Sequence, residues 1–334
     1  VWRGEAEAPP AWPATLVDRL AELLGDSEAD VRRAAAHAFS RYGDLRGTTA
    51  LVASLDDPDP LVRLFSARAL GRGGDRTAIA RLESACADAD AGVRTEAVAG
   101  LDALDASARI PVTLADDPSF HVRAAFATSL ASRPDGAERA IAQLSDPSST
   151  VVAAAAVALA ARAPDLAANH LEDLAGDPRW PVRAAAATAA GRVGPRGLAI
   201  LEVLARDERA AVRAAAIAAT AETVKTREAR AIVERGLAAT TLAERGSAVA
   251  RVAGSDWDDR LAVLEEAYGA ASGVDGIEVR ETIVDATADD PGAVGLLELA
   301  AEDPAPSVRA RARAALGLDR DDRGRGAVPR EPPF

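Results

Sequence analysis

The stretch DPSFHVRAAFATSL, residues 117–130, decides the fold because its frame recurs along the chain. An Asp-Pro turn is followed by three variable residues, then by Val-Arg and an Ala-rich segment. The frame returns as DPDPLVRLFSARAL from residue 57, DPRWPVRAAAATAA from residue 177 and DPAPSVRARARAAL from residue 303. Its valine recurs at about 30-residue intervals, which is typical of solenoid repeats. These valines are Val31, Val62, Val93, Val122, Val151, Val182, Val212, Val279 and Val308.

The spacing doubles between Val212 and Val279, so one further, degenerate repeat lies between them and about ten repeats are expected. Each repeat predicts two helices. In the second repeat these are TTALVASL and LVRLFSARAL, joined by the Asp-Pro turn. Proline ends the first helix, and the aspartate can accept backbone N–H groups at the start of the second. The fold class is therefore all-α, an α-α superhelix of stacked two-helix repeats.

The residue after the frame valine is nearly always arginine, and a half-buried arginine needs a carboxylate partner. The recurring aspartate supplies one, so we expect a ladder of Asp–Arg hydrogen bonds within or between neighbouring repeats. The fifth repeat breaks this ladder, because Val152 replaces the arginine. Asp146 and Arg280 share the frame. The predicted ladder consists of Asp26, Arg32, Asp57, Arg63, Asp88, Arg94, Asp117, Arg123, Asp177, Arg183, Asp207, Arg213, Asp303 and Arg309.

The turn aspartate, the Val-Arg pair and the Ala/Leu helix resemble the HEAT family, and within it the short HEAT-like repeats first associated with phycobilisome lyases. The resemblance covers residues 13–318. It implies a curved right-handed superhelix whose second helices line the concave side. It also implies binding of other macromolecules, since HEAT solenoids mostly act in this way.

Three segments are expected. Residues 1–12 form a Pro-rich extended segment, residues 13–318 the solenoid, and residues 319–334 a charged Pro/Gly-rich linker or tail. Within the solenoid, residues 225–275 depart from the frame. They are either eroded repeats or a joint or binding notch near Trp257 and Tyr268.

The predicted concave face consists of the residues two, three and six positions after each frame valine. In the middle repeats these are mainly Ala and Thr, so the groove is smooth and weakly apolar. Such a groove suits a helix or an extended peptide better than phosphate groups. The alternative is that small residues only allow tight curvature. The candidate partner-binding residues near one end are Arg33, His37, Leu64, Phe65 and Arg68.

The net charge of −13 at pH 7 argues against a nucleic-acid partner and favours a protein partner with basic or amphipathic character. No apolar run is long enough to predict a membrane span. The chain contains no methionine and opens on Val1, so the compartment is left open. A cytoplasmic location is favoured, with export as the alternative.

Neither a cofactor nor catalysis is expected. The histidines, His37, His121 and His170, lie in different repeats, and a metal site needs three or four converging ligands. Cys86 is the only cysteine, on a predicted helix face. We therefore expect a non-enzymatic scaffold that binds a protein or peptide along its concave face. One alternative is the repeat domain of a larger enzyme, such as a cyclophilin-type peptidyl-prolyl isomerase, with the catalytic domain C-terminal to it. A bilin lyase or isomerase remains an alternative by family analogy alone.

Overall fold

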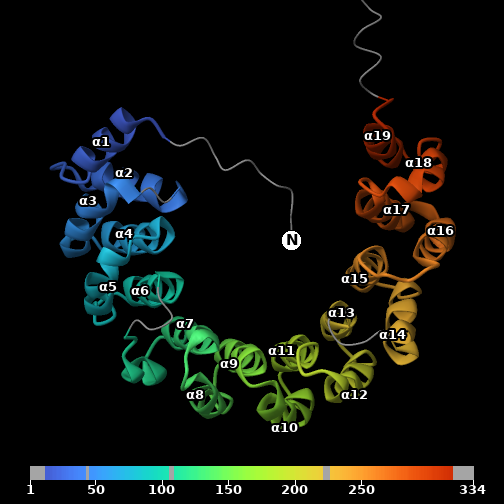
Figure 1. Cartoon of the computed structure of the whole chain (residues 1–334), viewed down its shortest axis with the longest axis horizontal. Helices are drawn as coiled ribbons and strands as arrows, with labels where there is room; N and C mark the ends of the chain where they lie inside the picture. Colours follow the sequence, from blue (N-terminus) through green and yellow to red (C-terminus); the bar gives the residue numbers. More distant parts are fainter. Residues whose placement is uncertain (1–11, 43–44, 105–108, 221–225, 319–334) are drawn as a thin grey trace, which may run out of the picture. The chain divides into compact units, whose positions relative to one another are not determined.

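The computed structural model describes residues 12–42, 45–104, 109–220 and 226–318. These residues form 19 α-helices and no strand, which confirms the all-α prediction. The chain divides into two compact units, Val1–Leu166 and Ala167–Phe334, and the division falls inside one helix, α10 (Figure 1). Each unit is a stack of two-helix repeats.

Unit 1 contains five repeats, each with a first and a second helix. The second helices are α2 (Ala29–Tyr42), α4 (Pro60–Gly73), α6 (Ala91–Leu104), α7 (Phe120–Ser129) and α9 (Ser149–Arg162). The first helices are α1 (Ala14–Leu23), α3 (Thr48–Ala53), α5 (Ile79–Ala85) and α8 (Gly136–Gln143). In the fourth repeat a 3-10 helix, η4 (Val112–Asp116), replaces the first helix. The other 3-10 helices are η1 (Leu45–Gly47), η2 (Ser54–Asp56), η3 (Arg76–Ala78) and η5 (Leu130–Ser132).

Unit 2 continues the same alternation. The first helices are α10 (Pro164–Ala175, which begins in unit 1), α12 (Pro195–Leu204), α14 (Arg227–Leu237), α16 (Arg260–Ala270) and α18 (Val294–Ala300), the last preceded by η6 (Pro291–Ala293). The second helices are α11 (Trp180–Ala190), α13 (Ala210–Ala219), α15 (Leu242–Ala253), α17 (Gly273–Thr287) and α19 (Pro306–Ala315). The described part of the degenerate segment lies in helix pairs α14–α15 and α16–α17.

Within each unit the second helices pack side by side in chain order and form one layer. In unit 1, α2 packs on α4, α4 on α6, α6 on α7 and α7 on α9. In unit 2 the same holds from α11 to α19. Figure 1 places these helices on the inner side of each unit's curve, with the first helices outside them. We call the two sets the inner layer and the outer layer.

The frame valine anchors the core of nearly every repeat. Burying one valine side chain contributes about 1.5 kcal/mol or more. The frame valines with 0% exposure are Val62, Val93, Val122, Val151, Val182, Val212 and Val308. The leucine eight positions later is also buried, as Leu70, Leu101, Leu130 and Leu159 show. The helical stripe predicted from the sequence therefore faces the inside of the stack.

Small residues bring neighbouring inner helices into close contact. Gly71 of α4 faces Gly100 of α6, and a Cβ atom added at Gly71 would lie 2.5 Å from the Gly100 Cα atom. No real Cβ atom approaches another atom so closely, so these two helices need glycine at this crossing.

The frame aspartate fixes the turn and is not the cap of the second helix. The Asp57 carboxylate accepts the Asp59 backbone N–H at 2.8 Å. Asp59 is the N-cap, and its carboxylate accepts the Leu61 N–H at 2.8 Å. Pro60 follows as the first helical residue, where its missing N–H does no harm. The frame aspartate therefore accepts a backbone N–H at the start of the second helix, as predicted, but this N–H belongs to the N-cap residue and not to the first helical turn.

Candidate interaction surface

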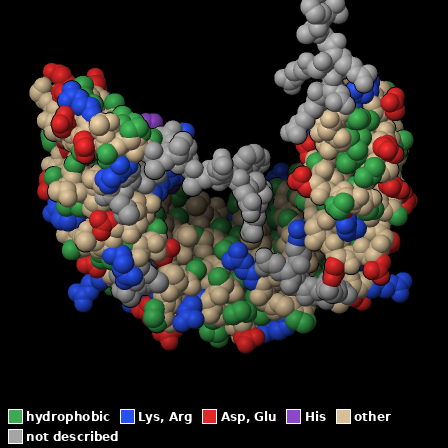
Figure 2. Space-filling model, turned by 45° about the horizontal axis from the view of Figure 1, so that its top comes forward, with side chains coloured by type: hydrophobic (Ala, Val, Ile, Leu, Met, Phe, Trp, Pro, Cys, Tyr) green, Lys and Arg blue, Asp and Glu red, His purple; other side chains and the backbone are tan. Residues whose placement is uncertain are grey.

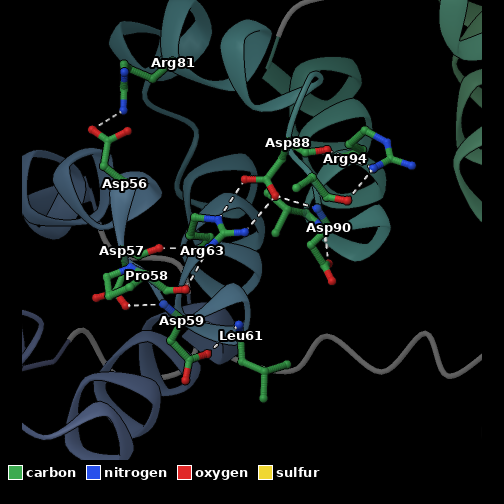
Figure 3. Close-up of polar contacts among 12 residues, drawn as sticks. Asp56, Asp57, Pro58, Asp59, Leu61, Arg63, Arg81, Asp88, Asp90 and Arg94 are labelled. Atoms are coloured by element: carbon green, nitrogen blue, oxygen red, sulfur yellow. Dashed lines mark hydrogen bonds and ion pairs between the residues drawn. The ribbon is translucent and has the colours of Figure 1, made fainter.

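Arg63 shows how one rung of the ladder is built (Figure 3). Its Nε and one terminal nitrogen donate to the two carboxylate oxygens of Asp88, at 2.8 and 2.9 Å. The other terminal nitrogen donates to the backbone carbonyls of Asp57 and Pro58, at 2.9 and 3.2 Å. One guanidinium thus ties the turn of its own repeat to the turn of the next.

The same rung recurs along both units. In each case the arginine Nε donates to an aspartate oxygen of the following repeat at 2.6–2.8 Å. The sequence left open whether these pairs form within or between repeats, and the structure places them between repeats. The pairs are Arg32–Asp57, Arg63–Asp88, Arg94–Asp117, Arg123–Asp146, Arg183–Asp207 and Arg280–Asp303.

Three members of the predicted ladder behave differently. Asp177 accepts two hydrogen bonds from Arg179 of its own turn, at 2.8 and 3.0 Å, because the preceding repeat has Val152 in place of arginine. Asp26 accepts the backbone N–H of Glu28 at 2.9 Å. Arg309 donates to the backbone carbonyls of Asp303 and Pro304. Among the described residues, these three therefore take the frame position without forming a rung between repeats.

Sequence reasoning missed Glu244, which takes the place of the absent aspartate in the degenerate repeat. Arg213 donates to its two carboxylate oxygens at 2.8 and 2.9 Å. Thr241 caps α15 and donates its hydroxyl to Glu244 at 2.6 Å. A threonine followed three residues later by glutamate is a capping signature, so a signal was present. Tyr268, which the sequence placed near a possible joint or notch, donates its buried hydroxyl to Asp303, a contact with the ladder that the frame does not predict.

The ladder carboxylates are held in their ionised form. The hydrogen bond from Arg94 lowers the pKa of Asp117, although burial opposes it. Burial alone would raise the pKa of Asp57, Asp88 and Asp207, but hydrogen bonds from arginine and from a backbone N–H outweigh it, so the pKa falls. The acidic groups at the turns are therefore fixed hydrogen-bond acceptors, poorly suited to moving protons at neutral pH.

The five candidate partner-binding residues lie close together on α2 and α4. The His37 and Phe65 rings have centroids 4.9 Å apart. Arg68 places its guanidinium 5.9 Å from the Phe65 ring and pairs with Glu96 of α6 at 2.7 Å. His37 of α2, Phe65 and Arg68 of α4, and Glu96 of α6 thus contact one another in sequence across three inner helices. We call these four residues the aromatic cluster.

Arg33 and Leu64 border the aromatic cluster. Arg33 pairs with Asp30 at 2.6 Å and with Asp59 at 2.9 Å, so it bridges α2 to the start of α4. Leu64 lies over Gly92 at the start of α6, since a Cβ added there would be 2.7 Å from the Leu64 side chain. Leu64 therefore packs between repeats.

The remaining inner face of unit 1 matches the predicted small-residue surface. Ala124, Ala125, Ala153, Ala154 and Val157 are all half-buried, so their small side chains reach the surface. Figure 2 shows acidic and basic side chains interspersed over the visible faces of the units. Such a surface can offer apolar contact beside fixed charges.

His121 and Cys86, which could have had a chemical role, are both packed against or among other side chains. The Phe120 and His121 rings lie 4.0 Å apart. Cys86 is 2% exposed, and burial raises the pKa of its thiol to about 12. In the described ranges, no three or more His, Cys, Asp or Glu side chains are grouped to hold a metal ion. No described helix has the length and apolar character to cross a membrane.

The comparison with known families decides the classification of the central part. The HEAT-repeat family matches residues 48–114 and 112–190. Residues 48–190 are HEAT repeats. The same two-helix architecture continues on both sides of this range in the described residues, so the chain is a HEAT-like α-α solenoid. None of the curated proteins matches this sequence.

Several solved structures are similar to this chain at low sequence identity. A chain of the Kap95p–RanGDP complex has a TM-score of 0.50 and 14% identity, covering 92% of this chain and 51% of that chain. YibA of E. coli has a TM-score of 0.46 and 20% identity, covering 79% and 99%. The CpcE–CpcF complex of phycocyanin lyase from Nostoc sp. PCC7120 has a TM-score of 0.34 and 19% identity, covering 95% and 98%. Only the first supports a statement about this chain, and it concerns the fold alone.

Proposed function

We propose that this HEAT-repeat scaffold is non-enzymatic and binds a protein or peptide along the inner layer of unit 1, with Phe65 as the anchor. The HEAT fold typically mediates protein binding. The aromatic cluster is the observation that carries the proposal. The Phe65 ring contacts both the exposed His37 and the ion-paired Arg68, and these contacts favour an ordered ring before binding.

Aromatic and arginine side chains dominate the binding energy of protein interfaces. A side chain that is already ordered loses less rotamer freedom on binding, which favours affinity. The small residues that follow on the inner face allow a partner backbone to approach closely. These features together favour a helix or an extended peptide laid across the second helices.

The chemistry of the polar groups supports a scaffold without catalysis. The carboxylates at the turns are held by arginine and stay ionised, and the Cys86 thiol is buried with its pKa raised to about 12. A general acid or base works best with a pKa near the operating pH, and a nucleophilic cysteine needs a lowered pKa. The pKa of the turn carboxylates is lowered, away from neutral pH, and the pKa of the Cys86 thiol is raised, so neither is suited to these roles.

Site-specific photo-cross-linking tests the proposal. A photoreactive phenylalanine analogue replaces either Phe65 or Leu16, an exposed apolar residue on the outer helix α1 of the same unit. Both variants are irradiated in lysate of the source cells, and the captured proteins are identified by mass spectrometry. We expect a defined partner at position 65 that is absent at position 16.

The identified partner is then purified and titrated against point variants. Phe65→Ala should weaken its binding about tenfold or more, since anchoring side chains contribute about 2 kcal/mol or more. Leu16→Ala should leave binding unchanged. Equal capture at both positions, or full affinity for Phe65→Ala, would show that the aromatic cluster is not the binding site.

A further inference from the structure

A groove opens in the outer layer of unit 2, between α14 and α16. It has a volume of about 440 Å³ and is lined by one face of each helix, from Arg230 to Ala238 and from Asp259 to Ala270. On α14 the lining residues are spaced by three and four positions, which places them on a single helix face. The α16 wall is about 16 Å long, given a rise of 1.5 Å per residue.

Six of the ten residues that line the groove are apolar. Leu237 and Val263 supply the larger apolar side chains, and Ala262 and Ala267 leave room between them. None of the ten lining residues is buried. An open groove of this kind would leave most of a small molecule in water. A helix laid along both walls, in contrast, would cover it.

One end of the groove holds a fixed cation. Arg230 donates to both carboxylate oxygens of Asp259, at 3.0 and 2.9 Å, and to Glu234 at 2.6 Å. Its guanidinium also lies 4.7 Å from the centre of the Trp257 ring. Two carboxylates and an aromatic face therefore already satisfy the only basic side chain of the lining.

The opposite wall carries Glu266, which is exposed. The lining thus contains three carboxylates, Glu234, Asp259 and Glu266, against one guanidinium. Glu234 and Asp259 share Arg230, so the surplus negative charge lies beside the apolar residues of the α16 wall, at Glu266. Complementary charge would be positive, placed beside apolar side chains at helical spacing.

We propose that the α14–α16 groove binds a basic amphipathic helix of a partner protein. Apolar side chains of that helix lie on Leu237 and Val263, and a lysine or arginine one turn away reaches Glu266. The proposal shares with the proposed function the premise that the chain binds proteins. It uses another unit and the other layer, so either site can fail without the other.

The test uses the whole chain and a fluorescent 14-residue helical peptide of leucine and lysine, with the lysines replaced by glutamates in a control peptide. Binding is measured by fluorescence anisotropy. The key variant is Glu266→Lys, and the matched control is Glu265→Lys. Both glutamates are exposed neighbours on α16, both changes alter the net charge equally, and only Glu266 lines the groove.

We expect the basic peptide to bind and the acidic one not to. Glu266→Lys should weaken binding about tenfold, because a like charge replaces an attractive one. Glu265→Lys and Phe65→Ala should leave binding within about twofold. Ala262→Trp, which fills the groove from an exposed helix position, should weaken binding as strongly as Glu266→Lys while leaving the circular dichroism spectrum unchanged.

Any one of three results would overturn the proposal. Equal weakening by Glu265→Lys and Glu266→Lys would mean that the peptide only senses the overall negative charge. Full binding by Ala262→Trp would mean that it lies elsewhere. Spermine serves as a competitor without apolar groups. If it displaced the peptide with the same affinity, the groove would bind small cations and the helix proposal would fail.

Discussion

At the scale of single residues, the frame aspartate does two tasks that its neighbours cannot share. Asp117 accepts two hydrogen bonds from Arg94, both at 2.8 Å, and a third from the Ser119 N–H at 2.8 Å. It is buried, whereas the adjacent Asp116 is exposed. Two identical side chains next to each other in the sequence therefore have very different roles.

We expect Asp117→Ala to lower the free energy of unfolding by about 2–3 kcal/mol, because it leaves the Arg94 guanidinium without its carboxylate. Asp116→Ala should change it by about 0.5 kcal/mol or less, as for most surface positions. Urea unfolding followed by circular dichroism measures both. Similar losses for the two variants would contradict the role assigned to the rung.

The thiol of Cys86 should be nearly inert in the folded protein. With a pKa of about 12, only on the order of 10⁻⁵ of it is thiolate at pH 7. We expect a thiol reagent such as dithionitrobenzoate to label Cys86 in the folded protein far more slowly than it labels free cysteine. After unfolding in guanidinium, labelling should become rapid. Rapid labelling without denaturant would show that the surrounding helices open readily.

Residue spacing predicted the ladder because the turn aspartate, the frame valine and the arginine after it recur in the same order in nearly every repeat. It could not predict that each arginine pairs with the following repeat, since that depends on the offset between stacked helices. Glu244 illustrates a second limit. A longer acidic side chain reaches Arg213 from another place in the sequence, so the interaction survives although the frame does not.

At the scale of helices, the second helix recurs in every repeat, whereas the first helix varies in length and type from one repeat to the next. In the fourth repeat the 3-10 helix η4 replaces the first helix, yet Arg94 still reaches Asp117. Periodicity identified the second helices because nine of the ten described ones, all except α15, carry the frame valine and the apolar stripe. A binding notch within residues 225–275 was one of the alternatives that the sequence left open, and the groove between α14 and α16 lies in that segment. Which helix faces line it could not be predicted, because that depends on how the two outer helices are spaced.

The crossing of α4 and α6 gives a direct test of helix packing. Gly71→Ala should destabilise the protein by about 1–3 kcal/mol, because the new methyl group would push against Gly100. Gly246→Ala is the matched control within α15, where an added Cβ meets nothing within 4 Å. It should stabilise the protein by about 0.5–1 kcal/mol, since alanine favours the helix. Thermal unfolding of both variants decides, and a stabilising Gly71→Ala would refute the close approach.

At the scale of the whole molecule, the rungs add up to a dependence of stability on pH. The folded-state pKa of Asp57, Asp88, Asp117 and Asp207 lies below the value of about 3.9 expected for the unfolded chain. Their contribution is therefore complete above about pH 5 and is lost as the pH falls through the folded-state values. We expect the free energy of unfolding to fall between pH 5 and pH 3.

Urea unfolding at pH 7, 5, 4 and 3 measures this dependence. Asp117→Ala should show a smaller loss over the same range, because it lacks one of the titrating rungs. A free energy that stays constant from pH 5 to pH 3 would mean that the carboxylates titrate alike in the folded and unfolded chains.

The arginine of each rung pairs with a carboxylate of the following repeat, so the array has a direction. This direction determines how such a chain can lengthen by duplication. A block that begins at one frame aspartate and ends before the next, such as residues 57–87, carries an acceptor at its front and a donor within. Inserted again before Asp88, its Arg63 would meet Asp88, while the original Arg63 would meet the copied aspartate. Duplication of whole blocks therefore restores every junction, whereas loss of the front half, residues 57–72, removes that acceptor and that donor together and leaves Arg32 and Asp88 without their partners.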